Sequence, residues 1–271
     1  MTTADFAQLE KFFDAYVARF ADATGVLLPM QQLKLEHSRH VAACARKIMQ
    51  AEQWPDNDFL TGSACALLHD IGRFSQYAQF QTFEDKRSIN HAQRGFEVLQ
   101  AEGALKFLPS AERDIILAAV RLHNVRDLPS DLPLATARFA HLVRDADKLD
   151  IFRVFQEAIE TGQLDEHPEI AWSLDRTPGV SPELMACVRE GRSVSYGQIR
   201  SLADFVMIQV CWLRSQMHYD AALALAMQRG ALDFREKFVC SLDPSAATRE
   251  CFADIRASIG QRLAAAKPGK T

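Results

Sequence analysis

An apolar run that ends in two polar side chains constrains the fold of this chain more than any other feature. Residues 64–68, Ala-Cys-Ala-Leu-Leu, are typical of a buried helix, and His69 and Asp70 follow directly. A buried polar group without a partner costs about 2–7 kcal/mol if it is neutral, and more if it is charged. A divalent metal ion would satisfy both side chains, provided that other parts of the chain supply further ligands.

Apolar side chains recur at helical spacing along most of the 271 residues. Residues 5–22 and 31–52 each show an apolar face with a period near 3.6. Further helices are expected from Pro109-Ser110, from Pro133, and over residues 182–190, 199–219, 220–229 and 244–265. Residues 161–182 are rich in turn residues, and the tail 267–271 is expected to fray. The chain shows no strand alternation, no repeat and no Gly-rich phosphate loop, so we predict an all-α fold.

Composition excludes several classes of protein. Hydrophobic residues make up 48% and charged residues 24%, as in ordinary globular proteins. The formal net charge of −4 disfavours nucleic acid as a general partner. The longest apolar runs are shorter than the ~18–20 residues that span a bilayer, and the N-terminus lacks the pattern of a signal peptide. Six scattered cysteines without a Cys-x-x-Cys pair indicate a reducing, cytoplasmic location. The oligomeric state stays open, and a homodimer is one option.

A histidine interrupts the apolar stripe of residues 31–52. His37 lies four residues from both Leu33 and Val41, whereas its rival His40 lies three positions further along the helix. We therefore expect His37, and not His40, to face the interior. Its alternative role is that of a core histidine bonded to a backbone carbonyl.

Other potential metal ligands fall on or near the apolar side of further helices. His91 begins a helix that we expect Ser88 to cap, His123 ends another, and Asp147 lies among apolar residues of a third. Neutral imidazole and carboxylate are the ligands of Zn, Fe, Mn, Co and Ni sites. We predict that one or two such ions are bound in the bundle core by six side chains: His37, His69, Asp70, His91, His123 and Asp147.

The segment Arg73–Arg87 differs from its neighbours. It has no clean period and contains four aromatic and three basic side chains. Long irregular connections are often lids or binding loops, although a surface excursion with aromatics that cap the core would look the same. We predict that this segment is a loop near the site.

Three motifs resemble the H…HD…D signature of the HD-domain metal-dependent phosphohydrolase superfamily. They are His37-Ser38, Leu68-His69-Asp70-Ile71-Gly72 and Asp145-Ala146-Asp147-Lys148-Leu149-Asp150. The resemblance covers about residues 30–155 and implies that His37, His69, Asp70 and Asp147 hold a first metal. His91 and His123 resemble the extra histidines of binuclear members such as the HD-GYP phosphodiesterases. The chain departs from that group because Asn124 replaces a second adjacent histidine and no Gly-Tyr-Pro motif follows.

The resemblance also implies an architecture. We expect one all-helical domain over residues 1–271, organised as an HD-domain helical bundle with additional C-terminal helices. Residues 25–160 would form the HD metal-binding core, and residues 161–271 a helical extension packed on it.

By the same resemblance, we expect a metal-dependent phosphohydrolase, either a phosphomonoesterase or a phosphodiesterase. Its substrate would be small and phosphorylated, with a nucleotide favoured. Asp70, as a bridge between two ions, and Lys148, as a neutralising cation, would be catalytic. Candidate phosphate binders are the cations near ligand-bearing ends: Arg73, Lys86, Arg87 and Arg126.

Two other functions stay open at this point. The HD fold also includes mixed-valent diiron oxygenases that resemble myo-inositol oxygenase and use the same six ligands. The metal content of protein purified without added metal would separate these two enzymes. A non-catalytic nucleotide-binding HD protein is the third option, but a binder has no need of all six side chains.

Overall fold

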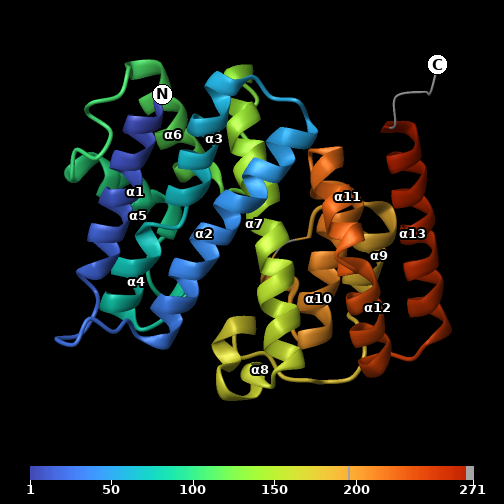
Figure 1. The fold of residues 1–271 in the computed structure, drawn as a ribbon. Helices are drawn as coiled ribbons and strands as arrows, with labels where there is room; N and C mark the ends of the chain where they lie inside the picture. Colours follow the sequence, from blue (N-terminus) through green and yellow to red (C-terminus); the bar gives the residue numbers. More distant parts are fainter. Residues whose placement is uncertain (195, 267–271) are drawn as a thin grey trace. The chain divides into compact units, whose positions relative to one another are not determined.

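Helices account for every regular element of the computed structural model, which describes residues 1–194 and 196–266 (Figure 1). No strand occurs in these two ranges, so the prediction of an all-α fold is confirmed. Within the same ranges, no helix combines the length and the apolar character that crossing a membrane would require. The expected fraying of residues 267–271 lies outside the described residues.

The chain divides into two compact units, Met1–Asp150 and Ile151–Thr271. The boundary falls inside the long helix α7 (Leu134–Glu160). We predicted a single domain with a core over residues 25–160 and an extension over residues 161–271 packed on that core. This organisation stays a prediction.

Unit 1 contains the elements that carry the six predicted ligands. In chain order they are α1 (Thr3–Ala18), α2 (Pro29–Ala51), α3 (Asp56–Leu68), α4 (Gly72–Phe80), the 3-10 turn η1 (Asp85–Arg87), α5 (His91–Ala101), α6 (Ser110–Leu122) and the first part of α7. Helix α3 packs against α2, α6 and α1, and α5 packs against α4 and α6. The end of α3 is therefore surrounded by the helices that bring the other histidines.

Local signals explain where several of these helices begin. Thr2 and Asp5 form a capping box at the start of α1, and Pro29 occupies the first turn of α2, where its missing N–H costs nothing. The expected cap of α5 by Ser88 is wrong, because Asn90 accepts hydrogen bonds from the N–H groups of Ala92 and Gln93. The Ser88 hydroxyl instead donates to the Glu84 carbonyl.

The segment 73–87 is only partly a loop. Residues 73–80 belong to α4, so the prediction of a continuous irregular segment is wrong for this part. Phe74 is fully buried in the unit 1 core and stacks edge-on against Phe13, which stabilises the short helix through tertiary contacts. Only residues 81–90 connect irregularly to α5, and they contain the turn η1.

Two glycines let α4 and α5 approach closely. A Cβ at Gly72 would lie 2.3 Å from the His91 carbonyl oxygen and 2.5 Å from the Gly95 nitrogen. A side chain at Gly72 would push the two backbones apart, whereas a Cβ at Gly95 would first meet the Val120 side chain, at 3.1 Å. The pair therefore fixes the distance between the His69-Asp70 turn and His91.

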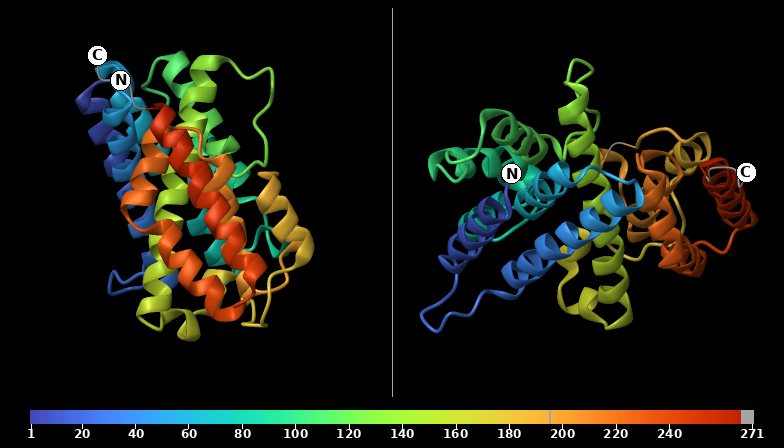
Figure 2. Two further views of the ribbon diagram at one scale, coloured as in Figure 1. Left: turned by 90° about the vertical axis from the view of Figure 1, so that its right-hand side faces the viewer. Right: turned by 45° about the horizontal axis from the view of Figure 1, so that its top comes forward.

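Unit 2 consists of the rest of α7 and a second set of helices. They are α8 (Gln163–Glu166), η2 (Pro168–Ala171), α9 (Pro182–Glu190), η3 (Tyr196–Gln198), α10 (Leu202–Cys211), the π-helical segment η4 (Trp212–Gln216), α11 (Asp220–Gln228), α12 (Ala231–Leu242) and α13 (Ala246–Ala266). Figure 2 shows α13, in red, beside α12 and α9. The sequence patterns did not identify α12, which follows α11 after the two turn residues Arg229 and Gly230.

A buried arginine organises the interior of unit 2. Arg235 of α12 is fully buried and donates hydrogen bonds to the side chain of Gln209 and to the carbonyls of Ala231 and Phe152. Its guanidinium also lies over the ring of Phe152, 4.3 Å from the centroid. Burial lowers the pKa of Arg235 to about 9, and its neutral acceptors compensate for the lost water.

Candidate metal centre

The structure brings all six predicted ligand side chains together inside unit 1. His37 comes from α2, His69 and Asp70 from the end of α3, His91 from the start of α5, His123 from the end of α6 and Asp147 from α7. Three overlapping groups have ligand atoms within 4.8 Å of one another: His37–His69–Asp70, His69–His123–Asp147 and Asp70–His91–His123. Donors from five helices or helix ends thus share one place.

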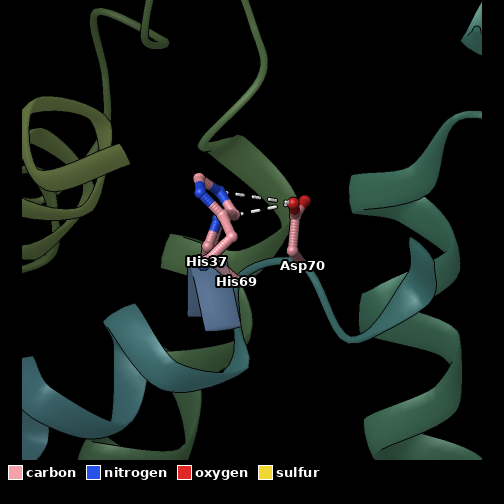
Figure 3. A group of neighbouring side chains, drawn as sticks. All are labelled: His37, His69 and Asp70. Carbon is pink, nitrogen blue, oxygen red and sulfur yellow. Dashed lines mark ion pairs between the residues drawn. The ribbon is translucent and has the colours of Figure 1, made fainter. Parts of the chain in front are cut away.

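One half of the cluster contains His37, His69 and Asp147. The Nε2 atoms of His37 and His69 each lie 3.7 Å from Asp70 Oδ2, and both rings face that carboxylate (Figure 3). Asp147 Oδ1 lies 3.0 Å from His37 Nε2 and 3.7 Å from His69 Nε2. These four side chains are the ones that the resemblance assigns to a first metal.

The other half contains His91 and His123. Their Nε2 atoms lie 2.9 Å from each other, and each lies 3.5 Å from Asp70 Oδ1. The two oxygens of Asp70 therefore face two different pairs of histidines. A carboxylate in this position can join two ion positions.

All four imidazoles are held through the nitrogen that points away from the cluster. His69 Nδ1 is 2.8 Å from the Ala66 carbonyl oxygen, and His123 Nδ1 is 2.7 Å from that of Val120. His37 Nδ1 is 2.7 Å from Asp150 Oδ2, and His91 Nδ1 is 2.7 Å from Asp85 Oδ2. Each acceptor requires a proton on Nδ1, so in the neutral ring the Nε2 lone pair is directed into the cluster. Metal-binding histidines are oriented in this way.

The arrangement fits a metal better than a hydrogen-bonded core. In the part of the chain that the structure describes, the buried Nε2 atoms of His37 and His69 have no hydrogen bond. With both rings neutral, the 2.9 Å contact between His91 and His123 places two lone pairs against each other. Two nitrogens bound to one ion at ~2.1 Å lie about 3.0–3.4 Å apart. A cation would therefore turn this repulsive contact into a pair of bonds.

The charges of the site suit cation binding. Burial would raise the pKa of Asp70, but Lys34, His69 and Arg73 hold it well below its usual value. Burial likewise opposes ionisation of Asp147, and its contacts with His37 and His69 keep that pKa well below the usual value. Both carboxylates are therefore charged at neutral pH.

The histidines respond differently to burial. Burial lowers the pKa of His69, and burial together with Arg73 lowers the pKa of His91 to about 3. Burial and Lys34 also act to lower the pKa of His37, but the carboxylates of Asp147 and Asp150 raise it overall. His69 and His91 are thus neutral near pH 7, which is the form that binds metals.

Two of the other predicted residues lie next to the cluster. Arg73 Nε is 3.5 Å from Asp70 Oδ1, while Arg73 Nη1 donates to Gln76, to the Phe83 carbonyl and to Asp85. Lys148 is buried and points to the Arg144 carbonyl and to Asp145 Oδ1, at 3.2 and 3.9 Å. Burial lowers the pKa of Lys148 to about 8.

The remaining predicted cations lie on the surface. Lys86 is exposed, Arg87 is 73% exposed and lies 3.7 Å from Glu84, and Arg126 is 63% exposed and lies 3.5 Å from Asp127. The structure does not bring these three side chains to the six ligands. Their role in binding phosphate stays a prediction.

His40 lies outside the cluster. Its side chain is 50% exposed, and its Nδ1 is 3.7 Å from Asp150 Oδ1. His37, one turn earlier on α2, points into the cluster instead. This placement agrees with the register expected from the apolar stripe.

Sequence reasoning missed three residues that contact the cluster. Asp150 and Asp85 hold His37 and His91, and Lys34 Nζ lies 2.8 Å from Asp70 Oδ2. Lys34 lies three residues before His37 on the same face of α2, and this spacing could have revealed that Lys34 lies near the cluster. Asp85 lies in an irregular connection, where no periodicity indicates the direction of a side chain.

Comparison with protein families gives an independent result. The family model described as HD domain matches residues 35–151, a range that includes all six ligand side chains. Comparisons with curated proteins and with solved structures gave no match. Residues 35–151 thus form an HD domain, the domain of the metal-dependent phosphohydrolase superfamily that the three sequence motifs resemble.

Proposed function

We propose that this protein is a metal-dependent phosphoric ester hydrolase that acts on a small phosphorylated substrate, with a nucleotide favoured. The observation that carries the proposal is the division of the ligands into two groups that share Asp70. Phosphoester hydrolysis uses such paired sites to hold both the attacking and the leaving oxygen.

The residues present fit one or two divalent ions of the Mn, Fe, Co, Ni or Zn class. His37, His69, Asp70 and Asp147 would hold the first ion, and Asp70, His91 and His123 would contribute to a second. Such ions lower the pKa of bound water to about 7 and polarise a phosphoryl oxygen.

The protein's own contribution is preorganisation. Asp150, Asp85 and two backbone carbonyls fix the ring orientation of the four histidines, so no reorganisation is needed when ligands bind. Asp70 and the four imidazoles are almost fully buried, so little of the cluster is in contact with water.

Lys148 has a supporting role in this proposal. Its ammonium lies 3.9 Å from Asp145 Oδ1 and therefore balances a buried carboxylate beside Asp147. A cytoplasmic location stays a prediction, as does the oligomeric state.

A metal-supplemented screen tests the proposed function. Purified protein loaded with Mn, Fe, Co, Ni or Zn would be assayed against nucleotides, cyclic nucleotides, sugar phosphates and p-nitrophenyl phosphate esters. Release of phosphate or nitrophenol that Asp70→Asn abolishes would support the proposal. Two irons per chain with a mixed-valence signal, together with no hydrolysis of any ester, would favour a diiron oxygenase and refute it.

A further inference from the structure

We infer that Lys34 is the phosphate-binding cation of this site and contacts the phosphoryl group of the substrate. The inference rests on the proposed function. Lys34 lies on α2, three residues before His37, so both side chains project from the same face of the helix. Its ammonium lies 2.8 Å from Asp70 Oδ2, the oxygen that faces His37 and His69.

Exposure shows which side of the cluster a substrate can reach. The side chains of His37, His69, Asp70, His91 and His123 are at most 7% exposed. Those of Asp147 and Lys34 are 20% and 17% exposed. Of these seven side chains, Asp147 and Lys34 are therefore the most accessible to a ligand that comes from solvent.

Lys34 is free to exchange its partner, whereas Arg73 is not. Arg73 Nη1 is held by Gln76, Phe83 and Asp85. In the ranges that the structure describes, Lys34 has one hydrogen-bond partner, Asp70, and otherwise lies over the Phe83 ring at 5.5 Å. A lysine ammonium on a flexible stem can move between acceptors that lie close together.

The charges at the site indicate which class of ligand Lys34 would bind. Bound metal ions would interact with the negatively charged Asp70 carboxylate, which is the present partner of Lys34. An anionic ligand beside the ions then offers Lys34 an oxygen of similar charge at the same place. A phosphoryl oxygen meets this requirement, because phosphate binds a lysine as a point charge.

Binding of inorganic phosphate tests this inference without any need for turnover. Metal-loaded full-length protein would be titrated with phosphate by calorimetry, as the wild type, Lys34→Ala, Lys34→Gln and Lys47→Ala. Lys47 is exposed on the same helix, so its removal controls for the loss of one positive charge. Metal content and circular dichroism would be measured on every sample.

We expect both Lys34 variants to bind phosphate about 10- to 100-fold more weakly, with metal content and fold unchanged. Lys47→Ala should bind phosphate as the wild type does. If Lys34→Ala misfolds, Lys34→Gln preserves the stem and decides the question.

Three outcomes would overturn the inference. Unchanged phosphate affinity in a folded Lys34→Gln variant is the first, and wild-type protein that binds no phosphate is the second. The third is increased metal content with unchanged phosphate affinity, which would make Lys34 a competitor of the metal for Asp70. Failure of the proposed function looks different: phosphate binds through Lys34, yet no phosphoester is hydrolysed.

Discussion

Replacement of Asp85 by asparagine should weaken one half of the metal centre and spare the other. The Asp85 carboxylate receives His91 Nδ1 at 2.7 Å, Gln76 Nε2 at 3.0 Å, Arg73 Nη1 at 3.2 Å and Asn124 Nδ2 at 3.3 Å. An asparagine has the same shape, but it loses the charge and replaces one acceptor oxygen with a donor. At least one of these donors must then turn away, and the orientation of the His91 ring loosens.

The size of the effect follows from the role of the bond to His91. Loss of an outer carboxylate that orients a metal-binding histidine typically costs 10–100-fold in metal affinity, or about 1.4–2.7 kcal/mol. Of the four histidines, Asp85 holds His91, while His37 is held by Asp150. We therefore expect Asp85→Asn to weaken the ion at His91 and His123 by this amount and to leave the ion at His37 and His69 unchanged.

Metal titration followed by calorimetry, with metal content measured by mass spectrometry, would test this expectation. Asp150→Asn serves as the reciprocal variant, because it should weaken the ion at His37. Asp14→Asn removes an exposed acid that pairs with Arg39 and should change nothing. Wild-type affinity and stoichiometry in a folded Asp85→Asn protein would refute the reasoning, as would equal weakening of both positions.

Three further predictions concern the same centre and its support. Asp70→Asn should abolish turnover and lower the content of both ions, because it removes the charge that both positions share; full metal content measured by mass spectrometry would contradict this. Gly72→Ala should lower stability by about 1–3 kcal/mol, since its Cβ would overlap the His91 carbonyl, whereas Gly260→Ala, where a Cβ meets nothing within 4 Å, should raise it by up to ~1 kcal/mol; thermal unfolding compares the two. Removal of metal by a chelator should lower the melting temperature, and re-addition of the metal should restore it, because bound ions stabilise the folded state; identical melting curves would argue against a metal centre.

The sequence by itself determined most of the helices and the helix or helix end on which each ligand residue lies. A period of 3.6 residues is a local property, so α1, α2 and α9 could be located from their own residues. The same periodicity separated His37 from His40, because an offset of about 60° around the helix lies between positions three residues apart. The apolar run before His69 and Asp70 likewise predicted that both would be buried.

Short or weakly patterned elements could not be located in this way. Helix α4 is stabilised by contacts such as that between Phe74 and Phe13, which lie 61 residues apart in the sequence. Helix α12 follows α11 after a single turn, and its buried Arg235 interrupts the apolar face that would have identified it.

Only the tertiary structure decided which ligand side chains group around each oxygen of Asp70. One oxygen of Asp70 faces His37 of α2 and His69, and the other faces His91 of α5 and His123 at the end of α6. Lys34 contacts Asp70, which lies 36 residues away in the sequence, and Asp85 contacts His91 from an irregular connection where no periodicity indicates the direction of a side chain. Helix packing sets these directions, because a side chain's partners depend on which backbones lie within a few ångströms, as Gly72 and Gly95 show.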